Sequence, residues 1–202
     1  MMSSTRRTTS STTMMTTTTS DLPVLDLDRA GWRAWLAEHH SDSRGCWLIL
    51  DRRKNPDGSK LVYIDAVEEA LCFGWIDSTM RPEGDLIVQR FTPRRKGSNW
   101  TELNIARCER LERLGLMTDA GRAAIPDRVF SIDYDIMAAI RSDPEVSANF
   151  DLLPPLYVRI RVANIQCKRG THLFDHRLDR FLNDTRRGLV RGAWGDGGRL
   201  SR

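Results

Sequence analysis

The feature that most constrains the fold is a change of hydrophobic period between residues 65 and 116. Apolar residues recur at helical spacing from Asp65, and alternate with polar ones over 75–81 and 86–91. Helical spacing returns from Ser98 onward. Alternation at every second residue is typical of strands, and spacing of three and four is typical of helices. The stretch therefore predicts a helix, a hairpin around 82–85 and a second helix.

The flanking segments extend this pattern. We expect a helix over 29–40 capped by Asp28, a strand over 45–51, a second short strand over 61–64 and a short helix from Thr118. Asp65 and Glu68 have the spacing of a capping box at the start of the central helix. The order predicts an α+β fold, a small antiparallel sheet packed with helices.

The chain divides into three parts by composition. Residues 1–21 are rich in Ser and Thr and contain no acid before Asp21, which predicts a disordered tail. Residues 22–126 carry the α+β pattern. Residues 127–202 predict a helical extension, with prolines 144, 154 and 155 at helix starts, helices over 157–166 and 172–187, and a glycine-rich end.

Charge is distributed unevenly along the chain. The net charge is only +4, yet residues 157–202 hold 11 Lys and Arg against four Asp and Glu, a net charge of +7. A basic quarter of this kind faces phosphate, nucleic acid or an anionic surface, or else is a solvated helix face. The sequence shows no membrane-length apolar run and no signal peptide, so we expect a cytoplasmic protein whose four scattered cysteines are reduced core residues.

A basic cluster precedes the expected helix start at Ser98. Arg90, Arg94, Arg95 and Lys96 lie beside Ser98 and Trp100, and a helix start offers unpaired backbone N–H groups. Cations next to such a start predict an anion or ligand site. The alternative is a solvated loop whose arginines pair with Glu102 or Asp85.

A second candidate lies in the segment FGWID. Phe73, Trp75 and Asp77 alternate and therefore face the same side, which is consistent with a pocket that has an aromatic wall and one carboxylate. The alternative is that the aromatic rings are core residues and Asp77 pairs with an arginine. No residue set specifies a reaction, so the catalytic residues stay unknown, and we expect neither a metal centre nor a cofactor.

Nucleic acid is the other class of partner. Basic residues accompany Trp100 in the cluster and recur at Arg159, Arg161, Lys168 and Arg169. Surfaces that combine cations with aromatic rings can stack bases and follow phosphates. The sequence contains no helix-turn-helix, RNA-recognition or zinc-finger motif.

Two motifs carry a resemblance to a known family. DAVEEALCFGWIDS at 65–78 and RFTPRRKGSNWTELNIARCERL at 90–111 resemble the YdeI/OmpD-associated family, also called bacteriocin-protection proteins. The segments GLMTDAG at 115–121 and WRAWLAEHH at 32–40 extend the resemblance to roughly residues 30–125. The resemblance implies a role in stress and in protecting cells against antimicrobial peptides. It implies no reaction, cofactor or catalytic residue.

The expected function is therefore an anion- or ligand-binding protein linked to stress or antimicrobial-peptide protection, and more a binding protein than an enzyme. The alternatives are a nucleic-acid-binding module and an enzyme that acts on a small phosphorylated or carboxylated substrate through Asp77.

Overall fold

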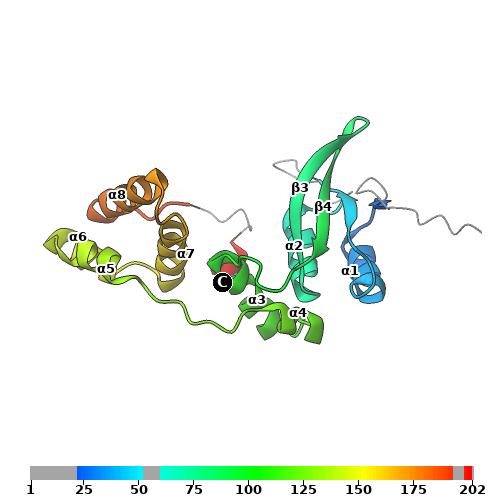
Figure 1. Ribbon diagram of the computed structural model, residues 1–202, viewed down its shortest axis with the longest axis horizontal. Helices are drawn as coiled ribbons and strands as arrows, with labels where there is room; N and C mark the ends of the chain where they lie inside the picture. Colours follow the sequence, from blue (N-terminus) through cyan, green and yellow to red (C-terminus); the bar gives the residue numbers. More distant parts are fainter. Residues whose placement is uncertain (1–21, 52–59, 193–197, 202) are drawn as a thin grey trace, which may run out of the picture.

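The computed structural model describes residues 22–51, 60–192 and 198–201. It is an α+β protein in which a sheet with four helices is followed by four further helices, and the chain then returns to the first part (Figure 1). The predicted tail at 1–21 and most of the glycine-rich end lie outside the described residues. Within the described ranges, no helix is both long and apolar enough to cross a membrane.

The sheet has four strands in the order β1-β2-β4-β3. These are β1 (Val24–Leu25), β2 (Cys46–Ile49), β3 (Trp75–Glu83) and β4 (Leu86–Pro93). The antiparallel pairing of β3 and β4 confirms the hairpin that the alternating pattern predicts. The expectation of a purely antiparallel sheet was wrong in one respect, because the two-residue strand β1 pairs in parallel with β2.

Helices α1 (Arg29–His39), α2 (Tyr63–Cys72), α3 (Glu102–Arg113) and α4 (Asp119–Ala124) complete this unit. Trp32 of α1 forms the contact with the sheet: its ring lies 5.5 Å from that of Phe91 and 6.3 Å from that of Trp75. Its indole N–H donates to the carbonyl of Ala66 in α2 at 3.1 Å. One tryptophan therefore joins α1, α2 and the sheet in a single core.

Two local predictions upstream of the hairpin were wrong. Residues 61–64 do not form a strand: only Val62 makes a bridge, to Asp51, and α2 begins at Tyr63. Asp65 and Glu68 consequently lie inside α2 rather than at a capping box. Both carboxylates form ion pairs with arginines of other elements, Arg29 and Arg110. Local sequence spacing does not reveal such tertiary contacts.

The start of α3 also differs from the prediction. The N-cap is Thr101, whose hydroxyl accepts the backbone N–H of Asn104 at 3.2 Å, so the helix begins at Glu102 and not at Ser98. Thr118 caps α4 as expected, with its hydroxyl accepting from Gly121. Helix α3 ends in a Schellman-type turn, in which Leu116 donates its backbone N–H to the carbonyl of Leu111 and Gly115 has a φ of 67°.

The second unit contains α5 (Tyr134–Arg141), α6 (Pro144–Asp151), α7 (Pro155–Gln166) and α8 (His172–Arg186). Pro144 and Pro155 stand at helix starts, as predicted. The four helices enclose a core of their own, which includes Ile136, Ile140 and Phe150 and is separate from that of the sheet unit.

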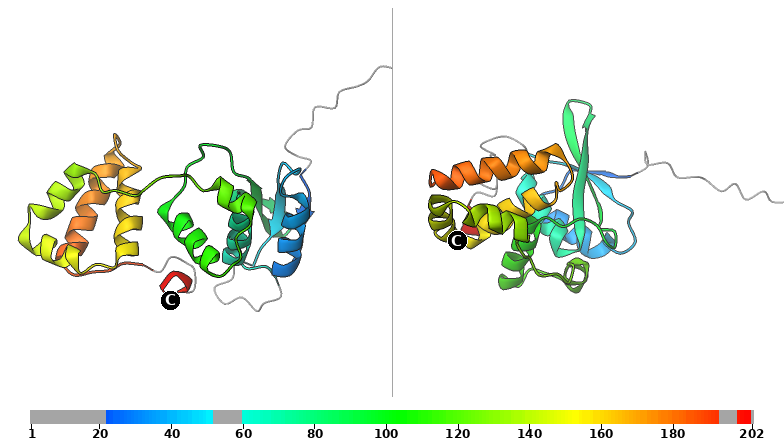
Figure 2. Two further views of the ribbon diagram at one scale, coloured as in Figure 1. Left: turned by 90° about the horizontal axis from the view of Figure 1, so that it is seen from below. Right: turned by 60° about the vertical axis from the view of Figure 1, so that its left-hand side comes forward.

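Polar contacts join the two units. Arg159 of α7 forms a fork with Glu109 of α3 at 3.0 and 3.1 Å and also reaches Glu102 at 3.1 Å. The C-terminal 3-10 turn η2 (Arg199–Ser201) returns to the sheet unit, where Arg199 contacts Asp65 and Glu68, each at 2.7 Å. Figure 2 shows this return of the chain to the neighbourhood of α3.

Candidate functional site

A pocket of about 360 Å³ lies between α7 and α8 of the helical unit. Helix α7 contributes Tyr157, Arg161, Asn164 and Ile165, α8 contributes Arg177, Arg180, Phe181 and Asp184, and the segment after α8 contributes Arg191. The volume is within the range that small-molecule sites usually have. Four of the nine lining residues are arginines and one is an acid, so the pocket is strongly cationic.

Helical spacing explains why these side chains converge. The four residues from α7 recur at intervals of four, three and one, and those from α8 at three, one and three, so each set occupies one face. Ile165 and Phe181 also belong to the core of the helical unit. The apolar residues that pack the two helices together thus carry the arginines into one pocket.

Among the described residues, one carboxylate lines the pocket, and both of its oxygens accept hydrogen bonds. Asp184 accepts from Nε of Arg191 at 2.6 Å and from Nη2 at 2.8 Å, a bidentate pair. These bonds hold the pKa of Asp184 below its ordinary value, although burial acts in the opposite direction. Arg180 lies farther away, with its Nε 3.9 Å from the same carboxylate, and its side chain is 63% exposed.

The other two arginines of the pocket, Arg161 and Arg177, both contact neutral groups. Arg161 lies 5.2 Å from the ring centroid of Tyr157 and donates to the backbone carbonyl of Arg191. Arg177 donates to the carbonyl of Asn164 at 2.5 Å. A guanidinium has five N–H donors and cannot lose its charge at ordinary pH, so both side chains stay cationic. These contacts hold the two guanidinium groups at the wall of the pocket.

The aromatic residues predicted in FGWID are mostly core. Trp75 is 1% exposed, and its indole N–H donates to the carbonyl of His40 at 3.1 Å. Phe73 is also buried. Asp77 pairs with Phe91 across the hairpin and accepts the hydroxyl of Tyr63 at 2.8 Å. The side chain thus takes its hydrogen bond from a tyrosine of α2.

The structure separates the predicted basic cluster. Arg90 is the cross-strand partner of Trp47 and adjoins Phe91 on β4, so it faces the side of the sheet opposite to Phe91 and Asp77. Arg94 is half-buried: its guanidinium lies 3.7 Å above the ring of Trp100 and donates to the carbonyl of Asn99 at 3.2 Å. Burial lowers the pKa of Arg94.

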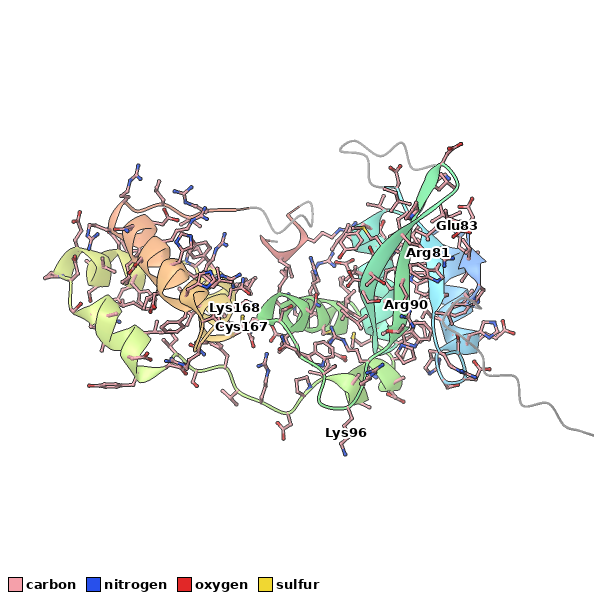
Figure 3. The ribbon with its side chains drawn as sticks, turned by 45° about the horizontal axis from the view of Figure 1, so that its top comes forward. Arg81, Glu83, Arg90, Lys96, Cys167 and Lys168 are labelled. Atoms are coloured by element: carbon pink, nitrogen blue, oxygen red, sulfur yellow. The ribbon has the colours of Figure 1, made fainter. Side chains whose placement is uncertain are left out.

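The rest of the cluster follows Arg94 in a turn. Arg95 and Lys96 are exposed, and Lys96 points away from the fold (Figure 3). Ser98 donates its backbone N–H to the carbonyl of Arg95 at 3.0 Å, which closes a turn four residues before α3 begins at Glu102. The predicted link between these cations and a helix start was therefore wrong, because Thr101 and not Ser98 begins the helix.

Two of the basic residues proposed to contact nucleic acid form ion pairs. Arg159 forms ion pairs with Glu102 and Glu109, and Arg169 forms ion pairs with Asp133 and Asp135 at 2.5 and 2.9 Å. Arg161 is the member of that set that lines the pocket. Arg177, Arg180 and Arg191 were not among the predicted site residues, and their signal was the +7 charge of residues 157–202.

Comparison with known proteins finds one sequence family that is similar to the sheet unit. Residues 26–124 match the family described as Domain of unknown function (DUF8412). The match covers α1 to α4 with β2 to β4 and stops before the helical unit that holds the pocket. Neither the curated proteins nor the solved structures include a match. The resemblance to the YdeI/OmpD-associated family remains a prediction.

Proposed function

We propose that the protein binds a small anionic ligand, phosphorylated or carboxylated, in the pocket between α7 and α8. The observation that supports the proposal is the charge of the lining: among the described residues, four arginines and one carboxylate line the pocket, and that carboxylate is already paired with Arg191. Charge-assisted hydrogen bonds from arginine to phosphate or carboxylate are among the strongest polar contacts in proteins.

The walls of the pocket add a preference for a ligand with an apolar part. Tyr157 and Phe181 line it with their rings 6.5 Å apart and inclined by 31°. A pocket with aromatic walls and a few oriented charges fits a small molecule better than an extended polymer. The first probes are therefore inorganic pyrophosphate, which tests the charge, and adenosine monophosphate, which adds a ring.

A binding role agrees with the chemistry better than catalysis does. Asp184 is held ionised by Arg191, so the pocket's one carboxylate is engaged as an ion-pair partner. General acid–base catalysis works best with a group whose pKa lies near the working pH. The proposed context, protection from stress or antimicrobial peptides, rests on the family resemblance alone, and the proposed cytoplasmic location rests on the sequence.

Calorimetric titration of the whole chain with pyrophosphate tests the proposal. Arg180→Gln removes one pocket charge with little harm to the fold, because Arg180 is largely exposed and only loosely paired. We expect it to weaken binding about tenfold, the effect of one charge-assisted hydrogen bond. Lys96→Gln removes one charge from an exposed turn and should bind like wild type.

Equal affinities in wild type, Arg180→Gln and Lys96→Gln would contradict the pocket as the site. A mixed-sequence oligonucleotide that binds more tightly than pyrophosphate, with an affinity that falls steeply with salt, would favour the nucleic-acid alternative instead.

A further inference from the structure

The face of the sheet opposite α1 and α2 carries a second group of cations. Trp47 of β2 lies directly across from Arg90 of β4, and Arg81 of β3 lies across from Val88. Val88 and Arg90 are two apart on β4, so their side chains share a face. Phe91, which follows Arg90, faces the opposite side, toward the helices. Trp47, Arg81 and Arg90 are therefore neighbours on one side of the sheet.

This face carries hydrogen-bond donors that have no acceptor within the described ranges. Trp47 is 6% exposed, yet its indole N–H has no hydrogen-bond partner within the described part of the chain. Arg90 is half-buried, and its Nε is shielded from solvent without a partner among the same residues. Indole and guanidinium N–H groups can only donate. Buried donors in folded proteins are almost always paired, so an acceptor is needed here.

Arg81 completes the group from the neighbouring strand. Its guanidinium lies 4.3 Å above the ring of Trp47, a cation–π contact that fixes both side chains. Nη2 of Arg81 pairs with Glu83 at 2.8 Å, whereas its Nε is buried without a partner among the described residues. Figure 3 shows Arg81, Glu83 and Arg90 following one another along the hairpin. Glu83 therefore pairs with one end of Arg81, whereas Nε of Arg81, Nε of Arg90 and the Trp47 indole N–H have no acceptor in the part of the chain that the structure describes.

We propose that this face binds a small oxyanion, a phosphate or a carboxylate, between the Trp47 indole and the guanidinium groups of Arg81 and Arg90. An oxyanion supplies several acceptor lone pairs and a negative charge, which is what three donor-only groups with two positive charges need. The site is separate from the arginine pocket, because it lies on the sheet and shares no residue with α7 or α8.

The indole N–H of Trp47 provides a direct readout. The protein has six tryptophans, so its indole N–H signals are few, and the Trp47→Phe variant identifies the one from Trp47. The ¹H–¹⁵N spectrum of the full chain is followed during separate titrations with inorganic phosphate and with acetate, at constant ionic strength set by NaCl. We expect the Trp47 indole signal to move saturably with at least one of them, and the stronger response identifies phosphate or carboxylate as the preferred group.

Two variants at Arg90 separate charge from structure. Arg90→Gln should weaken the response of the Trp47 signal about tenfold, and Arg90→Lys, which keeps the charge, should weaken it less. Arg180→Gln in the arginine pocket should leave it unchanged, so loss of one site does not mimic loss of the other. A Trp47 signal that stays still with both anions, or that moves equally in wild type and a folded Arg90→Gln protein, would overturn the proposal.

Discussion

Arginine organises the polar interior of the sheet unit. Glu68, 2% exposed, contacts Arg110 at 3.2 Å and Arg199 at 2.7 Å, and Arg29 approaches it at 3.6 Å. Glu69, 3% exposed, is held by Arg29 and by Arg33, each at 2.6 Å. Burying a carboxylate is costly unless charges and hydrogen bonds compensate it, and here arginines from three separate segments do so. The network fixes how α1, α3 and the C-terminal turn meet α2.

Removal of one member of this network should be strongly destabilising. Glu68→Ala leaves Arg29, Arg110 and Arg199 converging without their shared carboxylate, and breaking a buried ion pair typically costs about 3–5 kcal/mol. Urea unfolding measures the free energy of unfolding. Glu38→Ala is the control, because the Glu38 side chain is 77% exposed, and we expect a change within about 0.5 kcal/mol. Equal effects would contradict the role of the network.

The thiols should divide into three inert groups and one accessible group. Burial raises the pKa of Cys46 and Cys108 to about 12 and that of Cys72 to about 11. The prediction that all four cysteines are core residues was wrong for Cys167, which is exposed. A disulfide reagent at pH 8 should therefore modify one thiol quickly in the native protein and all four in denaturant. Cys167→Ser should abolish the fast reaction. A fast reaction that persists in that variant would show that a buried thiol becomes accessible.

Among the helices and strands, the features that could be predicted from the sequence were mostly those that depend on residues close together in the chain. Asp28 and Thr118 cap their helices because a side-chain oxygen meets an N–H three residues on. The start of α3 was placed wrongly because Ser98 and Thr101 are both competent caps, and the turn closed by Ser98 leaves Thr101 to begin the helix. The arginine pocket escaped prediction because it requires α7 and α8 to face each other.

The contact between α2 and α4 depends on one glycine. A Cβ atom at Gly121 would lie only 2.1 Å from the carbonyl oxygen of Cys72, and the same carbonyl accepts the Thr118 hydroxyl at 2.6 Å. We expect Gly121→Ala to lower the free energy of unfolding by about 3 kcal/mol, because backbone rather than a flexible side chain must move. Ala123→Ser on the exposed side of α4 should be nearly neutral. A stable Gly121→Ala protein would show that α4 is not held this closely.

The whole molecule consists of two cores joined largely by charge. Arg159 connects α7 to Glu102 and Glu109 of α3, and Arg199 brings the C-terminal turn to Asp65 and Glu68 of α2. Interfaces of this polar kind permit relative motion more readily than apolar ones. The arrangement of the units should therefore respond to loss of a single arginine, while each core stays folded.

Arg159→Ala tests this directly. We expect a larger radius of gyration in X-ray scattering, with helix content unchanged by circular dichroism, because the fork to Glu109 and the contact to Glu102 are lost together. Arg122→Ala is the matched control, since Arg122 pairs with Glu112 and Asp119 inside the sheet unit. If both variants scatter like wild type, Arg159 does not hold the units together.

An anion site between α7 and α8 can be mapped on the backbone amides of the full chain by titration with pyrophosphate. We expect saturable ¹H–¹⁵N shifts concentrated at residues 157–165, 177–184 and 191, with binding weakened about tenfold in Arg180→Gln. Shifts that are absent there at low ionic strength, or that spread evenly over exposed basic residues such as Arg95 and Lys96, would contradict it.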